Sequence, residues 1–162
     1  MTETEAGVAD VIAAAAADLD AEVAIRSLMV SYMRACDDHD ANAVAELFHD
    51  EAVWESARSG DRLVGRGAIR AAYAADCARL TFCVHYLTNE WIHIDATRAK
   101  ARWCYFEPAV NRGELAVWTA GRYDLELARH GDRWGFTSFY ISPVLAAPQQ
   151  DGWGTVPVVA LP

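Results

Sequence analysis

Long strand patterns fill the second half of the chain, and they limit its fold more than any other feature of the sequence. Residues 99–107 alternate between apolar and polar side chains, and residues 115–128 and 134–144 form two further strand patterns. Gly121 predicts a bend in the second of these strands. His130-Gly131-Asp132 has the composition of a hairpin turn between the last two. These segments predict part of an antiparallel sheet.

A fourth strand is predicted just before these three. Residues 81–88 are rich in aromatic and β-branched side chains, which favour strands. Residues 91–94 continue the pattern after a bulge that we expect at Asn89-Glu90.

The first half of the chain has helical patterns. Apolar side chains recur at helical spacing from residue 20 to the sequence Asp38-His39-Asp40, where the helix should end. Shorter helices are predicted at residues 42–48 and 68–80, with a short strand at 51–55 between them. Three helices followed by four long strands predict an α+β fold. The curved antiparallel sheet should wrap around the helices as a cone with an internal cavity.

The length of 162 residues suits one domain with a sizeable core. We predict three segments. Residues 1–19 form an Ala-rich acidic lead-in that is either helical or disordered. Residues 20–145 form the domain, and residues 146–162 form a C-terminal tail. The apolar run within residues 152–162 could cover the mouth of the cavity or a partner subunit.

Charge and cysteine content exclude several classes of function. A net charge of −9 repels phosphate backbones, so we expect no nucleic-acid partner. The run Ala13–Ala17 is too short to span a membrane, and the acidic N-terminus does not resemble a secretion signal. Four cysteines lie in apolar stretches without any Cys-x-x-Cys pair, which predicts buried free thiols, no metal site and a cytoplasmic location.

His85 is the first candidate for chemistry, because it is the polar exception in an otherwise apolar strand. One interpretation is a core histidine that is hydrogen-bonded to the backbone. The other is a general base that faces the cavity, since imidazole titrates near neutral pH. The remaining histidines, His39, His49, His93 and His130, are predicted to lie in loops or exposed positions, with no metal-binding spacing.

Three further residues could assist His85, and each also has a structural interpretation. Asp37, at the end of the first helix, is either a solvated acid or a carboxylate that orients an imidazole. Tyr32 lies in the apolar stripe of that helix and is either a core residue or a cavity hydroxyl. Glu107 ends a strand and is either a solvated acid or a cavity residue, since it shares a face with Trp103 and Tyr105, which suit a cavity wall. The aromatic residues predicted to line a substrate pocket are Trp54, Trp103, Tyr105, Trp118, Phe139 and Tyr140.

Several segments, taken in order, resemble the SnoaL-like branch of the NTF2-like superfamily, and in particular its bile-acid dehydratase, scytalone dehydratase and lindane dehydrochlorinase types. The resemblance covers about residues 20–145. It rests on the segments Ala24–Leu28 with Tyr32 and Asp37, Leu47–Trp54, Gly65–Ile69, His85–Asn89, Gly121–Tyr123 and Gly131–Trp134.

This resemblance implies a cone-shaped α+β domain that forms dimers or trimers and uses neither a metal nor an organic cofactor. It also implies that Asp37 and His85 match a catalytic Asp–His pair, and that Tyr32 matches a functional tyrosine. Glu107 aligns with a strand-end acid that is Asp in the family. The chain departs from the family in the last strand, where residues 136–143 contain no arginine, and at Glu55-Ser56, where the base of ketosteroid isomerase is not reproduced.

Three functions follow from these observations. The first is a cofactor-free lyase or isomerase of the dehydratase type, in which His85 and Asp37 move a proton on a small hydrophobic, polycyclic molecule. The second is a non-catalytic module that binds such a molecule in the same pocket. The third is an assembly module that requires a second chain.

Overall fold

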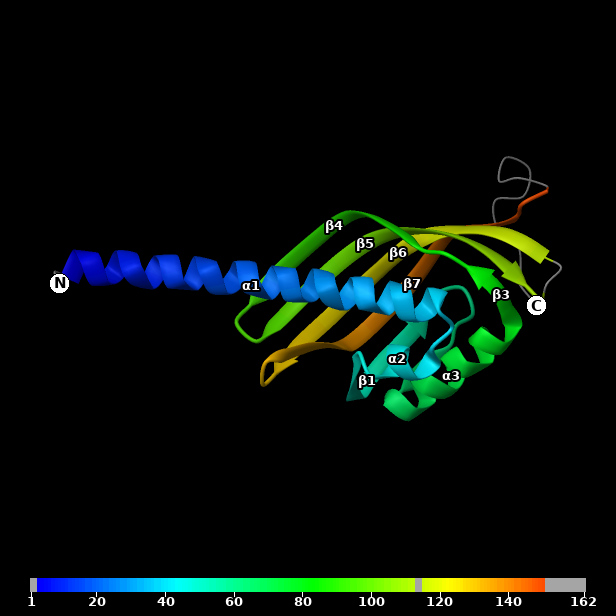
Figure 1. Cartoon of the computed structure of the whole chain (residues 1–162), viewed down its shortest axis with the longest axis horizontal. Coiled ribbons are helices and arrows are strands. Elements are labelled where there is room, and N and C mark those ends of the chain that lie inside the picture. Colours follow the sequence, from blue (N-terminus) through cyan, green and yellow to red (C-terminus); the bar gives the residue numbers. More distant parts are fainter. Residues whose placement is uncertain (1–2, 113–114, 151–162) are drawn as a thin grey trace.

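A sheet of seven strands curls around one side of a long helix in the computed structural model (Figure 1). The structure describes the backbone of residues 3–112 and 115–150, and the side chains of that range from residue 12 onward. The elements are α1 (Glu3–Asp37), α2 (Ala41–Ala45), β1 (Phe48–Ser56), β2 (Arg62–Val64), α3 (Arg66–Arg79), β3 (Leu80–Cys83), β4 (Tyr86–Asp95), β5 (Arg98–Asn111), β6 (Leu115–His130) and β7 (Arg133–Pro148).

The strand order β2-β1-β7-β6-β5-β3, with β4 also paired to β5, confirms the predicted α+β cone. The sheet differs from the prediction in one respect, because β1 runs parallel to β7 while the other pairs are antiparallel. No helix in the described part of the chain has the length and apolar character needed to cross a membrane.

Helix α1 is longer than the predicted apolar stripe. It begins at Glu3, so the described part of the Ala-rich lead-in is helical, and it projects beyond the sheet (Figure 1). The side chains of Ile12 and Leu19 are exposed. From Ala21 onward the helix buries a stripe of residues against the sheet, including Ile25 and Met29.

Helix α2 ends earlier than predicted. Asp40 caps its first turn, because the Asp40 carboxylate accepts hydrogen bonds from the backbone N–H groups of Asn42 and Ala43 at 3.1 and 2.9 Å. The predicted helix at 42–48 was wrong in its last residues. Phe48 instead opens β1 opposite Phe136 of β7 and is buried, since pairing and burial outweigh the helical pattern of so short a segment.

The strand predicted at residues 81–88 is interrupted at His85. Cys83 pairs with Ala109 and Tyr86 pairs with Phe106, so the register is the same on both sides of the gap. Val84 therefore lies opposite Pro108, which has no N–H to donate, and the Val84 N–H donates to the Pro108 carbonyl at 3.3 Å. The missing donor weakens the ladder at this point.

Other local predictions agree with the structure. Asn89 has φ of 54°, and the register shifts between Thr88 and Trp91, which confirms the predicted bulge. The hairpin turn at Gly131 is also confirmed, with φ of 59°.

Strand β7 continues to Pro148, past the predicted end of the domain at residue 145, because Ala146 and Ala147 are buried. Residues 151–162 of the predicted tail lie outside the described residues.

Gly121 lies where β6 and β7 shift register, and the close approach of the strands there requires a glycine. A Cβ at this position would overlap the Ser142 carbonyl oxygen and lie 2.7 Å from Pro143 Cα and 2.9 Å from a ring carbon of Tyr105.

We predict that Gly121→Ala lowers the free energy of unfolding by about 1–3 kcal/mol, because backbone atoms must shift to accept the methyl group. Urea denaturation measures this change. The control is Gly67→Ala in α3, where nothing lies within 4 Å of the added Cβ. That variant should be neutral or more stable by less than about 1 kcal/mol. Equal stability of the two variants would contradict the packing argument.

Candidate active site

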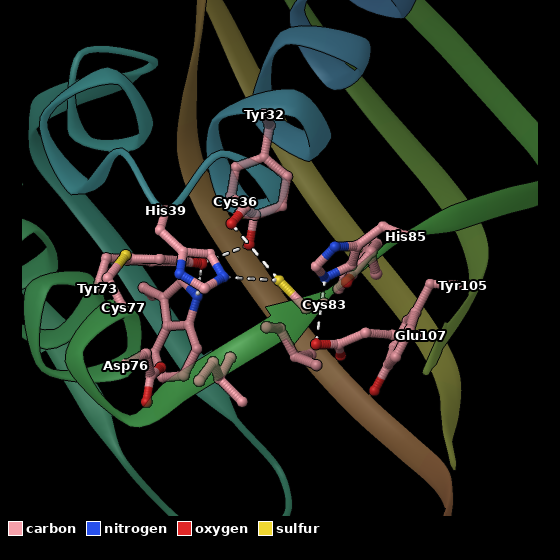
Figure 2. A pocket seen from close by; sticks show the side chains of 14 residues that line it. Tyr32, Cys36, His39, Tyr73, Asp76, Cys77, Cys83, His85, Tyr105 and Glu107 are labelled. Atoms are coloured by element: carbon pink, nitrogen blue, oxygen red, sulfur yellow. Dashed lines mark hydrogen bonds and ion pairs between the residues drawn. The ribbon is translucent and has the colours of Figure 1, made fainter. Parts of the chain in front are cut away.

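A cavity of about 140 Å³ lies between the end of α1, helix α3 and the inner face of the sheet (Figure 2). Most of its lining is apolar or aromatic, with a few polar groups that converge on it. The lining residues are Tyr32, Cys36, His39, Trp54, Tyr73, Asp76, Cys77, Leu80, Cys83, His85, Tyr105, Glu107, Tyr123 and Ile141.

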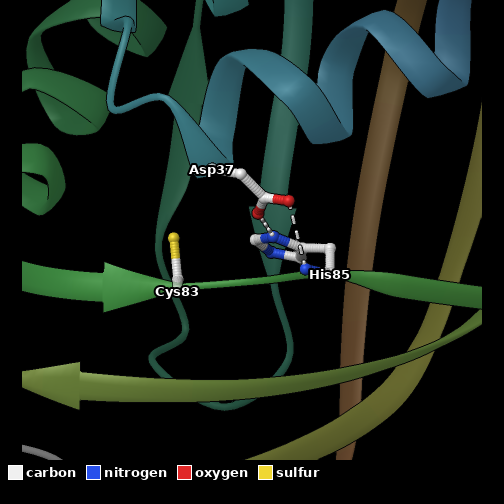
Figure 3. Close-up of side chains that lie close together, drawn as sticks. All are labelled: Asp37, Cys83 and His85. Atoms are coloured by element: carbon white, nitrogen blue, oxygen red, sulfur yellow. Dashed lines mark hydrogen bonds and ion pairs between the residues drawn. The ribbon is translucent and has the colours of Figure 1, made fainter.

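Asp37 and His85 are in contact, which the sequence could not establish. His85 Nδ1 lies 2.6 Å from Asp37 Oδ1, and the backbone N–H of His85 donates to Asp37 Oδ2 at 3.4 Å (Figure 3). Both oxygens of one carboxylate therefore hold one histidine. Since a carboxylate is only an acceptor, Nδ1 carries the proton and a neutral ring has its lone pair on Nε2.

Glu107 lies on the opposite side of the imidazole from Asp37. Because β3 and β4 pair with β5 in the same register, His85 and Glu107 lie opposite each other, and their side chains share the inner face of the sheet. His85 Nε2 and Glu107 Oε1 are 3.7 Å apart, and Glu107 Oε2 accepts a hydrogen bond from the Thr119 hydroxyl at 2.9 Å. The side chains are 9% exposed for His85, 27% for Asp37 and 18% for Glu107, so this row of three is largely shielded from water.

Tyr32 belongs to a second hydrogen-bonded group in the cavity. Its hydroxyl bonds to the hydroxyl of Tyr73, and the Trp54 indole N–H donates to the same Tyr73 oxygen at 3.0 Å. Burial raises the pKa of both tyrosines well above the ordinary value. Both phenols therefore stay protonated near neutral pH and act as hydrogen-bond donors.

Two cysteines and a histidine lie beside the Asp–His pair. The Cys83 thiol is 3.5 Å from the Cys36 carbonyl oxygen and 3.6 Å from His39 Nε2. Burial, followed by the nearby Glu107 charge, raises the pKa of the Cys83 thiol to about 12. Burial also raises the pKa of Cys36 well above its ordinary value. The thiols are therefore poor nucleophiles here.

Asp37, Cys83 and His85 are also the residues that could hold a metal ion. Their ligand atoms all lie within 4.8 Å of one another, although no metal motif was predicted from the sequence. A thiol binds metals as the thiolate. The raised pKa of Cys83 opposes that form, and Nδ1 of His85 is already bonded to Asp37. The arrangement is better suited to proton transfer than to metal binding.

The predicted pocket aromatics divide into two groups. Trp54 and Tyr105 line the cavity, as expected. The other four do not. Trp103 and Phe139 are buried in the core, Tyr140 lies on the opposite face of β7 and is 39% exposed, and Trp118 stacks on Phe106.

Sequence reasoning missed several cavity residues. Tyr73 was visible as an apolar position of the third helix, and Tyr123 as an inward position of a strand, but neither pattern distinguishes a cavity wall from a core. His39 was predicted to lie in a loop or an exposed position. It lies in the turn between α1 and α2, as predicted, with φ of 57°, and its ring also lines the cavity.

Known proteins share this fold. The family model of the SnoaL-like domain matches residues 17–140. A proposed aromatic-ring hydroxylase from Novosphingobium aromaticivorans is 27% identical, with a TM-score of 0.75 over 82% of this chain and 96% of that chain. Comparison with curated protein sequences gives no match.

Two further solved structures show the same fold at lower identity. A proposed scytalone dehydratase from Novosphingobium aromaticivorans is 17% identical, with a TM-score of 0.75 over 80% of this chain and 88% of that chain. The protein LinA is 18% identical, with a TM-score of 0.75 over 90% of this chain and 96% of that chain. On the family match and the fold together, the chain belongs to the SnoaL-like family, with the NTF2-like cone as its fold.

Proposed function

We propose that the chain is a lyase or isomerase that moves a proton on a small hydrophobic molecule with its own side chains. The row Asp37–His85–Glu107 is the observation that carries this proposal. It provides an oriented base, a partner for the charge that the base acquires, and a second acid within 3.7 Å of the basic nitrogen. The solved neighbours that are described as a dehydratase and a dehydrochlorinase also favour lyase chemistry.

His85 is the base in the proposed reaction. Its Nε2 removes a proton from a carbon next to a carbonyl or a ring system, and the electron pair of the broken C–H bond moves into the developing enolate. The imidazolium that forms is stabilised by Asp37. General acid–base help of this kind accelerates a reaction by about a hundred- to ten-thousand-fold.

The proton then leaves by one of two routes. In a dehydration, the electron pair of the enolate forms the new double bond as the hydroxyl departs, the hydroxyl takes a proton from Glu107 or Tyr32 and leaves as water, and the imidazolium returns the abstracted proton to that donor. In an isomerisation, the imidazolium returns its proton to another carbon. Glu107 lies directly across from Nε2, while the Tyr32–Tyr73 pair supplies neutral hydroxyls that can bind a developing oxyanion.

We predict that His85→Gln lowers catalysed proton exchange by about a hundred- to ten-thousand-fold. The assay uses 2-tetralone and related fused-ring ketones in heavy water and follows deuterium incorporation next to the carbonyl by mass spectrometry. The matched control is His93→Gln, since His93 is exposed on β4 and should not matter. Unchanged exchange in His85→Gln would favour a non-catalytic binding module.

We also predict that Asp37→Asn lowers the same exchange rate by at least tenfold while the protein stays folded. An amide can hold the ring in the wrong tautomer and cannot stabilise the imidazolium. The control is Asp38→Asn, because Asp38 is the exposed neighbouring acid. Circular dichroism checks the fold of both variants. If the two variants lose equal activity, the role assigned to Asp37 is wrong.

A further inference from the structure

The cavity continues outward into a groove of about 400 Å³. Six residues line both spaces, so a ligand can extend from one into the other. They are Trp54, Asp76, Leu80, Tyr105, Glu107 and Ile141. The proposed proton transfer uses only the inner part, which leaves the groove without an assigned role.

Asn111 lies in the wall of this groove with an unsatisfied side chain. It is 2% exposed, and neither its amide oxygen nor its amide nitrogen has a hydrogen-bond partner among residues 3–112 and 115–150. Buried amides are nearly always hydrogen-bonded, because losing water without a replacement costs stability. An amide kept unpaired beside an open groove indicates a partner that comes from outside the chain.

The distance from this amide to Glu107, which lies beside the proposed base His85, can be read along β5. Glu107, Ala109 and Asn111 follow one another on the inner face, and all three line the groove. Four residues of strand correspond to roughly 13 Å. The wall between the two ends includes Ala109, Val117 and Ala146, whose small apolar side chains leave room for a hydrocarbon body, although charged side chains such as Arg58, Asp61 and Arg79 also line the groove.

We propose that Asn111 is the distal anchor of the substrate, in a subsite for a hydroxyl or amide group about 13 Å from Glu107. The amide nitrogen needs an acceptor and the amide oxygen needs a donor. A neutral group that both donates and accepts pairs with both atoms, while a carboxylate or a hydrocarbon leaves the oxygen unpaired. The substrate class is therefore an elongated apolar molecule whose far end carries a neutral polar group.

This inference gives the proposed enzyme its substrate class, but it is tested by binding alone. The probes are 4,4′-dihydroxybiphenyl and 4-hydroxybiphenyl, two rigid rods that differ by one terminal hydroxyl. Tryptophan fluorescence titration should show that the parent chain binds the diol about tenfold more tightly than the mono-ol. Asn111→Leu, which has a similar volume, should bind both probes equally.

Thermal stability separates a ligand-binding role from a structural one. Asn111→Leu removes an unpaired buried amide, so its melting temperature without ligand should equal or exceed that of the parent chain. The control Asn42→Leu changes an exposed asparagine on α2 and should keep the tenfold preference. Equal affinities in the parent chain, or a preference that survives in Asn111→Leu, overturns the proposal.

A crystal structure of the parent chain with the diol tests the contact even if the variant does not fold. We expect a diol oxygen within hydrogen-bond distance of the Asn111 amide. A water molecule that pairs with both amide atoms beside the bound diol contradicts the proposal. The titration repeated in His85→Gln distinguishes two kinds of failure. If His85→Gln still prefers the diol but the parent chain catalyses no proton exchange, the proposed enzyme function is wrong and the subsite stands. If the parent chain catalyses exchange but shows no preference for the diol, the subsite is wrong and the proposed function stands.

Discussion

The bond between Asp37 and His85 joins the two halves of the fold at the site. Asp37 ends the long helix α1, and His85 lies in the gap between β3 and β4, so the carboxylate links a helix terminus to the edge of the sheet. It accepts from the ring and from the backbone N–H of the same residue. The Asp37 side chain therefore sets both the position and the tautomer of the His85 imidazole, and this ring lies in the wall of the cavity.

Burial determines which polar groups of the cavity stay neutral. The tyrosines and thiols have raised pKa values because they are desolvated, so they remain neutral. The carboxyl groups of Asp37 and Glu107 face the imidazole from its two nitrogens. This arrangement is consistent with the proposed proton transfer on a hydrophobic molecule.

The sequence allowed the α+β class and the positions of the long strands to be predicted, because these depend on periodicity. The chemistry-bearing residues that it singled out by residue type remain predictions. The sequence did not reveal that His85 leaves the ladder, since that depends on Pro108 of β5, which lies opposite the preceding residue, Val84. It also could not separate cavity from core among the aromatics. Trp103 and Tyr105 share one face, yet only Tyr105 lines the cavity, because the cavity borders only the second half of β5, which no single strand pattern reveals.

Pro108 has a consequence beyond its own position. A ring nitrogen that carries no hydrogen removes one rung from the ladder while both strands keep their length and register. His85, next to Val84, therefore leaves the hydrogen-bonded ladder although the chain contains no insertion or loop at this point. For protein engineering, this means that a side chain can be released from a β-ladder by placing a proline opposite the residue before it, while the two strands keep their register.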